Sequence, residues 1–426
     1  MKIPLFCAPW LLLAAGAAPA ETLTLPQALA AARQNLEVAI ARGDLAAARA
    51  DILAANHAPL PQLSGKASNI DLDNGLGGGS LLGRKRIDKS IGIDWTWERG
   101  DKRVLRTRAA EQLAAAAQSD LDDVTLQQLL ATQAAFLDLL AAQERGSLVE
   151  ALAQDARQLA TTTARRVKAG DLPAQDASRI EIEAQRAAAD GQAAVLDRQR
   201  AALGLAQLIG QTEAADQLVA RGDWSLLHTP PAADVGALVQ ARPEVRAAAS
   251  RVQAAQAAAD GARALRKSDI TWGVSYDHYP GTSRAQVELR AQMPLQWGYS
   301  YDGEIGRALA QQRQAEDQLE KTTRLATLEL QRMRLEAAGT LERARRHEIE
   351  IMPRARAVAQ TAEQAYQRGA IGLTDLLDAR RTLRATLIDA VAARQEAAKA
   401  LGAWQLRTRP DTDTPAISTS SAKALP

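Results

Sequence analysis

The sequence predicts a mainly helical fold with a small β portion, built from two internal repeats. Two observations predict it: a composition suited to long helices, and landmarks that occur twice. Of 426 residues, 46% are apolar and only 3% aromatic, and alanine dominates the apolar set. Alanine has the highest helix propensity and lets helices pack closely. The 52 basic and 50 acidic residues nearly balance, which gives no reason to expect a nucleic-acid partner.

The internal repeat appears as short segments that recur in the same order. The first landmark is a helical segment found at 28–33 and again at 237–242. The second is a glycine followed six residues later by an aspartate, found as Gly170 with Asp176 and again as Gly369 with Asp375. Such self-similarity indicates that both halves fold as the same unit. The first half is longer between its landmarks, and the glycine-rich stretch 71–89 accounts for this as a longer loop.

The N-terminus has the pattern of a secretory signal peptide over residues 1–20. Lys2 precedes an apolar run, and Ala18-Pro19-Ala20 supplies a cleavage site. Cys7 precedes the apolar run rather than following it, so a lipid anchor is the less favoured alternative. Because Cys7 is the only cysteine, a chain cut after residue 20 has no disulfide and no thiol chemistry.

The mature chain divides into two repeats, a connector and a disordered tail, expected at 21–210, 235–407, 211–234 and 408–426. Each repeat begins with an amphipathic helix, continues through two short strands and enters a long helical run that ends at a glycine. Seventy helical residues span about 105 Å at about 1.5 Å per residue. A second helix returns after the glycine. Each repeat therefore contains a long antiparallel helical hairpin.

The strand segments alternate apolar and polar residues with a period of two. The alternation is clear at 90–97, 270–277 and 286–293 and weak at 62–70. One alternative is a set of strands covering an ordinary core. The aromatic residues favour a membrane barrel, because Trp95, Trp97, Trp272, Trp297 and four of the five tyrosines lie in or beside these strands, as in an aromatic girdle. Four strands cannot close a barrel, so several copies must contribute.

The expected turns carry specific motifs. The second hairpin tip reads Tyr-Gln-Arg-Gly-Ala-Ile-Gly-Leu-Thr-Asp-Leu-Leu-Asp-Ala-Arg over 366–380, and the first tip, 167–176, looks like its partner. Together with the strand exits 95–100 and 293–298, these motifs resemble the TolC-like outer membrane efflux protein family. The resemblance covers about residues 23–407. Details of the second half are similar to the CzcC-type branch that serves heavy-metal pumps.

This resemblance implies a homotrimer in the cell outer membrane, with four strands per chain in a twelve-stranded β-barrel continuous with a long periplasmic α-helical barrel. It implies a periplasmic adaptor (membrane fusion) protein and an inner-membrane efflux transporter as partners, besides outer-membrane lipid. By the same resemblance, Asp176 and Tyr366 help to hold a closed state. Asp375 and Asp378 match an acidic constriction. Ile371 departs from the family, because some members have a basic gate residue there.

The positions of the acidic residues agree with a constriction. Asp375 and Asp378 are three residues apart on one helix and share a face, so threefold symmetry would gather their carboxylates around the axis. Such a ring favours cations. Alternatively, Asp375 caps the returning helix. Asp176, which follows Pro173, has the same alternative as an early helical residue.

The tips are also the expected docking surface for the adaptor. The candidates are small or apolar residues at the turns: Gly170, Gly369, Ile371, Gly372 and Leu373. Glycine adopts positive φ and lets another backbone approach closely. The segment Ile-Gly-Leu-Thr also resembles the family's adaptor-contact motif. Alternatively, the apolar side chains pack inside the hairpin and the glycines serve only the turn.

The sequence therefore predicts an exit channel that conducts passively and is not an enzyme. It shows no nucleophile motif and no phosphate loop. Its four histidines are isolated except for His347, which lies beside Glu348 and Glu350 in a charged helical run that is better explained as a solvated face. We therefore expect no cofactor and no metal site. The expected substrates are heavy-metal cations, and the alternative is drugs or other small organic compounds. The less favoured classes are a periplasmic adaptor and a structural coiled-coil protein.

Overall fold

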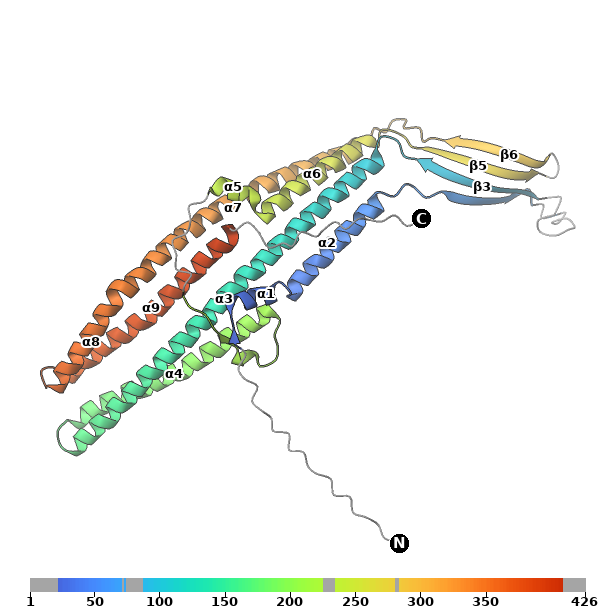
Figure 1. Cartoon of the computed structure of the whole chain (residues 1–426). Helices are drawn as coiled ribbons and strands as arrows, with labels where there is room; N and C mark the ends of the chain where they lie inside the picture. Colours follow the sequence, from blue (N-terminus) through green and yellow to red (C-terminus); the bar gives the residue numbers. More distant parts are fainter. Residues whose placement is uncertain (1–21, 71–72, 74–86, 225–233, 280–282, 409–426) are drawn as a thin grey trace, which may run out of the picture. The chain divides into compact units, whose positions relative to one another are not determined.

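The computed structural model describes residues 22–70, 73, 87–224, 234–279 and 283–408. The predicted signal peptide, most of the loop at 71–89, much of the connector and nearly all of the tail lie outside these residues. The prediction of a mainly helical fold with a small sheet is confirmed (Figure 1).

Corresponding elements follow one another in the two halves. The first half contains α1 (Leu25–Ala32), α2 (Leu36–Ala55), β2 (Gln62–Ser68), β3 (Asp88–Trp97), α3 (Lys102–Lys168) and α4 (Ala174–Ile209). The second contains α5 (Val235–Ala241), α6 (Pro243–Ala264), β5 (Ile270–Tyr279), β6 (Ser283–Gln292), α7 (Asp302–Arg346), the π-helical segment η2 (His347–Ile351), α8 (Met352–Gln367) and α9 (Leu373–Thr408). The short elements β1 (Thr22–Leu23), η1 (Ala215–Gln217) and β4 (Val219–Ala220) complete the described chain.

The first helix of each repeat is divided in two, which the sequence analysis did not predict. In the second repeat, Arg242 is extended (φ −64°, ψ 136°) and Pro243 begins α6, where its missing N–H costs nothing. In the first repeat, a turn separates α1 from α2. Nδ2 of Asn35 in this turn donates to the carbonyl oxygen of Leu208 at 2.7 Å, which fixes the break against the end of α4.

The long runs also differ. In the first repeat, α3 is one helix of 67 residues, as predicted. In the second, η2 separates α7 from α8 just before Pro353. Proline has no N–H to donate and its ring crowds the preceding turn, so the α-helical hydrogen bonds are interrupted there.

The four-stranded sheet has the order β2-β3-β5-β6 and is antiparallel throughout. Its central pair, β3 and β5, joins the two repeats, and Trp95 faces Trp272 in this register. The strand β2, whose sequence alternates only weakly, is held in the sheet by its antiparallel pairing with β3, in which Ser64 lies opposite Gly92. This register places Gln62, Ser64 and Lys66 on the polar face of the sheet.

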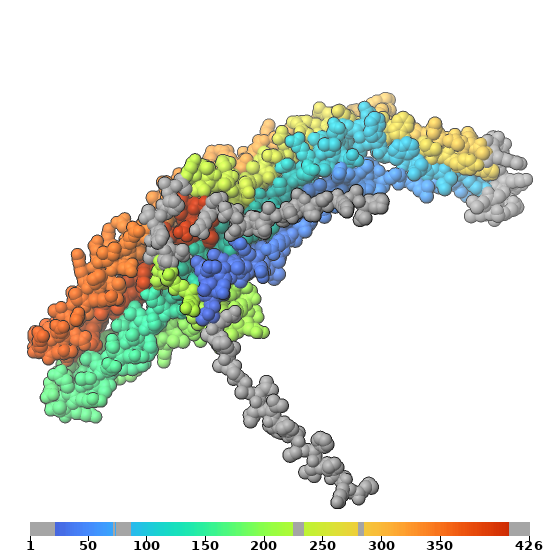
Figure 2. All heavy atoms as spheres, viewed as in Figure 1, coloured from blue at the N-terminus to red at the C-terminus, as the bar shows by residue number. Residues whose placement is uncertain are grey.

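The described chain forms two compact units, and each contains parts of both repeats. The first comprises 22–35, 128–224 and 334–408 and contains both hairpin tips. The second comprises 36–127 and 234–333 and contains the sheet. In Figure 2, each unit contains residues coloured for the first half of the sequence (blue to green) and residues coloured for the second half (yellow to red). The predicted repeats divide the chain along its sequence, whereas the units divide it in space.

The core of the first unit gathers around α3 and α4. Phe136, Leu137 and Leu139 pack with Leu205 and Leu218, all 2% exposed or less. The parallel pair β1 and β4 lies beside this core, and Nε2 of Gln143 on α3 donates to the carbonyl oxygen of Ala220 at 2.9 Å. α3 also contains a window apolar enough to cross a membrane by composition, but half of that window is buried in the protein.

Candidate functional site at the hairpin tips

Both hairpins turn through the same hydrogen-bonded motif. In the first, the N–H of Asp171 donates to the carbonyl oxygen of Arg166 at 2.9 Å, and Gly170 has φ +83°. In the second, the N–H of Ala370 donates to the carbonyl oxygen of Ala365 at 2.8 Å, and Gly369 has φ +70°. This six-to-one bond with a left-handed glycine is a Schellman motif, which satisfies carbonyl groups at the helix end.

The predicted acidic residues lie at the starts of the returning helices. Asp176 is in the first turn of α4 and partly exposed, and no hydrogen bond joins it to Tyr366 within the described chain. The Asp375 carboxylate accepts a hydrogen bond from the N–H of Gly372 at 3.3 Å. This is the contact required by the capping alternative. Because Asp375 is exposed, the same side chain can also face another copy of the chain.

Asp378 has a cationic neighbour that the sequence analysis missed. Its carboxylate lies 3.5 Å from Nη1 of Arg381, and its side chain is 65% exposed. Arg381 uses its other nitrogen, Nη2, to bind Glu183 on α4. The guanidinium therefore partly offsets the Asp378 charge and ties that residue to the opposite hairpin.

The docking candidates divide by exposure. A Cβ added at Gly170 or Gly369 would meet nothing within 4 Å, and at Gly372 it would meet only the Asp375 carboxylate at 3.8 Å. Ile371 is partly exposed, whereas Leu373 is 7% exposed. The burial of Leu373 favours the alternative in which this side chain packs inside the hairpin. The accessible part of the candidate surface is thus the turn itself and Ile371.

Ion pairs connect the two hairpins along α9. Cations of α9 bind carboxylates of α3 or α4 in four pairs: Arg381 with Glu183, Arg384 with Asp190, Arg394 with Glu144, and Lys399 with Asp138. We call these four pairs the α9 ladder. Its members come from opposite repeats, so the ladder holds the two hairpins of one chain together within the first unit.

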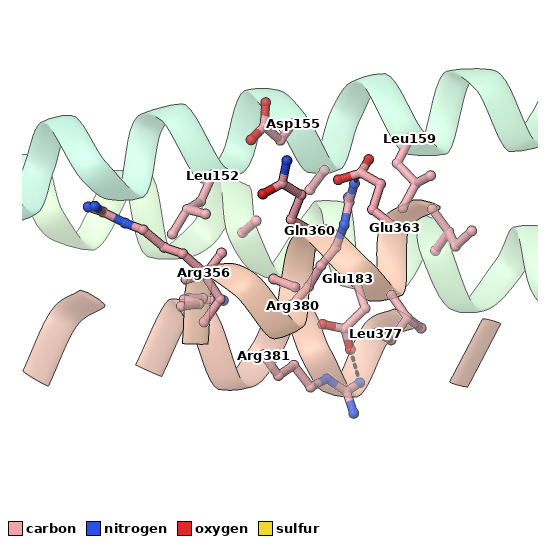
Figure 3. Close-up of a pocket in the computed structure, with 16 residues that line it drawn as sticks. Leu152, Asp155, Leu159, Glu183, Arg356, Gln360, Glu363, Leu377, Arg380 and Arg381 are labelled. Carbon is pink, nitrogen blue, oxygen red and sulfur yellow. Dashed lines mark hydrogen bonds and ion pairs between the residues drawn. The ribbon is translucent and has the colours of Figure 1, made fainter. Parts of the chain in front are cut away.

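A cavity of about 300 Å³ lies between the hairpins beside the ladder (Figure 3). Leu152 and Leu159 of α3 and Leu377 of α9 supply apolar walls. Arg380 lines it as well and binds Glu363 at 2.8 Å, which closes a further pair within the second hairpin. The space between the two hairpins is thus bordered both by apolar side chains and by charge pairs.

Glu183 shows the electrostatic consequence of the ladder. The hydrogen bond from Arg381 holds the pKa of Glu183 below its ordinary value of 4.5, and the charges of Arg381 and Arg186 act in the same direction against partial burial. The carboxylate therefore stays ionised at any pH near neutrality. A basic cluster following the tip motif and the acidic residues of α4 are visible in the sequence, but only the fold pairs them.

The predicted girdle residues are all exposed. The exposed fractions are 42% for Trp95, 58% for Trp97, 42% for Trp272 and 87% for Trp297. Leu63 of the neighbouring strand β2 and Leu289 of β6 are each 78% exposed. The sheet therefore has an apolar face that the described chain leaves uncovered.

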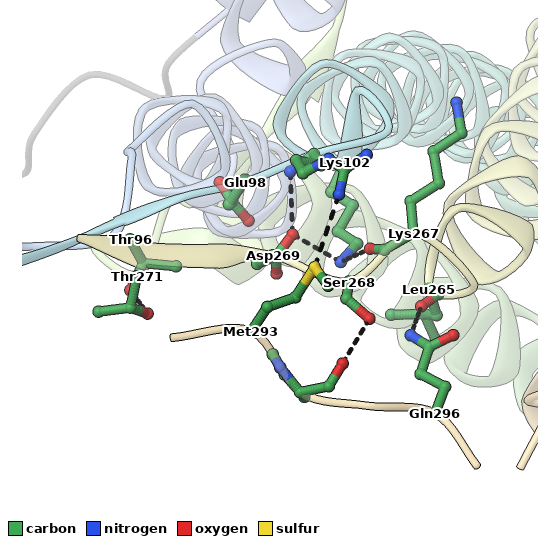
Figure 4. A network of polar contacts seen from close by, with 12 residues as sticks. Thr96, Glu98, Lys102, Leu265, Lys267, Ser268, Asp269, Thr271, Met293 and Gln296 are labelled. Atoms are coloured by element: carbon green, nitrogen blue, oxygen red, sulfur yellow. Dashed lines mark hydrogen bonds and ion pairs between the residues drawn. The ribbon is translucent and has the colours of Figure 1, made fainter. Parts of the chain in front are cut away.

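Polar contacts hold the junction between strands and helices (Figure 4). Nζ of Lys102 donates to Asp269 and to the carbonyl oxygen of Lys267, both at 2.8 Å. The backbone N–H of Arg99 donates to the same Asp269 carboxylate at 2.9 Å. The two repeats are thus linked where β3 is followed by α3 and where α6 is followed by β5.

No three His, Cys, Asp or Glu side chains gather as a metal site within the described part of the chain. A cation site built from Asp375 and Asp378 would need carboxylates from several copies.

Comparisons with known proteins agree with these features. The family model for the outer membrane efflux protein matches residues 235–404. No curated protein sequence matches the chain. Among solved structures, a membrane protein from Pseudomonas aeruginosa is similar with a TM-score of 0.77 at 18% identity, over 90% of this chain and 93% of that one.

Two further structures share the fold. The outer membrane protein VceC from Vibrio cholerae has a TM-score of 0.74 at 18% identity, over 89% of this chain and 94% of its own. The CmeC outer membrane channel of Campylobacter jejuni has a TM-score of 0.75 at 13% identity, over 90% of this chain and 85% of its own. Residues 235–404 are thus similar to the outer membrane efflux protein family, and the chain as a whole shares its fold with these three solved structures.

Proposed function

We propose that this protein is the outer-membrane exit channel of a tripartite efflux pump. In this proposal it conducts substrate passively from an inner-membrane transporter and a periplasmic adaptor to the exterior, as a homotrimer without enzymatic activity. The observation that carries it is one chain with two parts: a four-stranded sheet with an uncovered apolar, tryptophan-bearing face, and two long hairpins with matching tips.

The exposed edges and the apolar face of the sheet support a homotrimer and a location in the outer membrane. It has two edge strands, β2 and β6, whose backbone groups need partners in lipid. Three copies would supply twelve strands and allow closure. The apolar face then meets the outer membrane, and the hairpins extend into the periplasm.

Membrane extraction and conductance test the proposal. The full chain expressed in a Gram-negative host should fractionate with the outer membrane, resist extraction with buffer and form ion-conducting pores in planar bilayers. A periplasmic adaptor would fractionate with the inner membrane, and a structural coiled-coil protein would leave in buffer. Either outcome would contradict the channel assignment.

For the substrate, we propose heavy-metal cations. The exposed carboxylates of Asp375 and Asp378 support this, together with the sequence resemblance to the CzcC-type branch. A deletion strain should grow poorly on zinc, cobalt or cadmium while keeping its drug tolerance. Normal metal tolerance with increased drug sensitivity would instead assign drugs or other small organic compounds.

A further inference from the structure

An ion pair crosses the middle strand on the polar face of the sheet. The register aligns Asp94 of β3, Gly273 of β5 and Arg290 of β6 in one row. Oδ1 of Asp94 lies 2.6 Å from Nη2 of Arg290. The two residues are separated by a whole strand, so their side chains meet above the backbone of β5.

Gly273 makes this pair possible. Neighbouring strands are about 4.8 Å apart, so the backbones of β3 and β6 are about 9.6 Å apart and a side chain on β5 would occupy the space between. A Cβ at Gly273 would collide with Oδ1 of Asp94 and stand 3.0 Å from Nη2 of Arg290. Glycine in a strand interior weakens the strand. The ion pair explains why glycine occurs at this position.

Arg290 is also one of two cations among the described side chains of that face. The described charged side chains there are four carboxylates and two cations: Asp88, Asp94, Asp277 and Glu288, with Lys66 and Arg290. Nη1 of Arg290 lies 3.6 Å from Glu288, so this one side chain contacts two of the four carboxylates. Without it, the net charge of these six side chains would change from −2 to −3.

We propose that Arg290 is a specificity-determining residue that limits the cation preference of the pore. This rests on the proposed channel function, in which the apolar face of the sheet meets lipid and the polar face lines the lumen. Asp94 and the gap at Gly273 position the guanidinium over the wall, where it offsets fixed negative charge. Fixed charge in a pore wall attracts counter-ions and excludes ions of the same sign.

The effect should depend strongly on salt. The Debye length is about 30 Å at 0.01 M, about 10 Å at 0.1 M and about 3 Å at 1 M. Wall charge therefore acts across a wide lumen only in dilute salt. Because exclusion grows roughly with the square of wall charge, we expect Arg290→Gln to raise the K⁺/Cl⁻ permeability ratio about twofold at 10 mM, and to leave it unchanged at 1 M.

The experiment measures reversal potentials of reconstituted full-length channels across KCl gradients. Asp94→Asn should lower the ratio, and the double variant Asp94→Asn/Arg290→Gln should return it to the wild-type value, because its net wall charge is unchanged. Lys89→Gln is the matched control, since it removes a positive charge from the opposite face of β3 and should have no effect. The variants are repeated in an Asp375→Ala/Asp378→Ala background, so that the tip carboxylates do not dominate selectivity.

The outcomes separate this inference from the channel assignment. Absence of conductance in the wild type would contradict the proposed function itself. A conducting wild type with equal ratios in Arg290→Gln and wild type at 10 mM would overturn the role of Arg290. So would a shift that persists at 1 M, because screened wall charge cannot produce it. If Arg290→Gln alone does not assemble, the double variant Asp94→Asn/Arg290→Gln compared with Asp94→Asn gives the test, since loss of the Arg290 charge should raise the ratio.

Discussion

Gly402 leaves room on the buried side of α9 for the amide of Gln133. A Cβ at Gly402 would overlap that side chain, and Gln133 is itself only 4% exposed. We expect Gly402→Ala to lower the free energy of unfolding by about 1–3 kcal/mol through overpacking, a loss that the better helix propensity of alanine, about 1 kcal/mol, offsets only in part. Denaturant unfolding of the purified protein measures this change.

Gly204, another helical glycine, provides the control for the Gly402 substitution. It lies on the exposed side of α4, and a Cβ there would meet nothing within 4 Å. Gly204→Ala should therefore stabilise the protein by up to about 1 kcal/mol. Equal effects of the two substitutions would contradict the close packing assigned to Gly402.

At the scale of elements, the α9 ladder makes the contact between hairpins depend on pH. The Arg381 side chain is 55% exposed, so its pair with Glu183 contributes roughly 0.5–1 kcal/mol at most. Because the pKa of Glu183 is lowered in the fold, this stabilisation is fully present above the ordinary value of 4.5 and is lost as the pH falls through the lowered pKa. Glu183→Gln should thus reduce the melting temperature at pH 7, and this reduction should shrink as the pH falls through the lowered pKa.

The comparison variant for this prediction is Glu181→Gln. Glu181 lies on the same helix and is exposed, and its hydrogen bond is to Gln185 rather than to a cation of α9. It should change the melting temperature little at any pH. A deficit of Glu183→Gln that does not shrink as the pH is lowered below the ordinary value of 4.5 would show that the pair with Arg381 is not its cause.

The helices and strands also differ in how far they can be predicted from the sequence. Hairpin lengths, the glycine turns and three strands follow from local patterns, since helical propensity, positive φ and a period of two are properties of neighbouring residues. The break between α1 and α2 at Asn35 depends on the carbonyl oxygen of Leu208, far along the chain. The pairing of Glu183 with Arg381 likewise depends on two helices meeting. Such contacts have no local signal, and β2 acquires its polar face only from its register with β3.

At the scale of the whole molecule, the tip carboxylates should act together across copies. If Asp375 and Asp378 gather around an axis, trivalent cations should bind there and block single-channel current. Asp375→Ala/Asp378→Ala should abolish the block and leave the oligomer intact, as judged by its migration without heating. Undiminished block would assign the cation site to other residues.

Partner binding is tested at the exposed turn. Gly372 has open space around it, so Gly372→Trp can direct its ring into solvent and obstruct an adaptor. We expect correctly inserted, heat-resistant trimers that no longer crosslink to the adaptor and no longer support efflux. Loss of the trimer, or crosslinking at the wild-type level, would count against docking at this tip.

The π-helical segment η2 coincides with a one-residue difference in length between the two repeats. Gly170 follows Gly100 by 70 positions, whereas Gly369 follows Gly298 by 71, and all four have positive φ. In an uninterrupted helix, one added residue would rotate everything beyond it by about 100°. A wider turn absorbs the addition locally, and it lies just before Pro353, where a helical hydrogen bond is already missing. The second tip thereby stays in phase with the first, and the two hairpins remain quasi-equivalent.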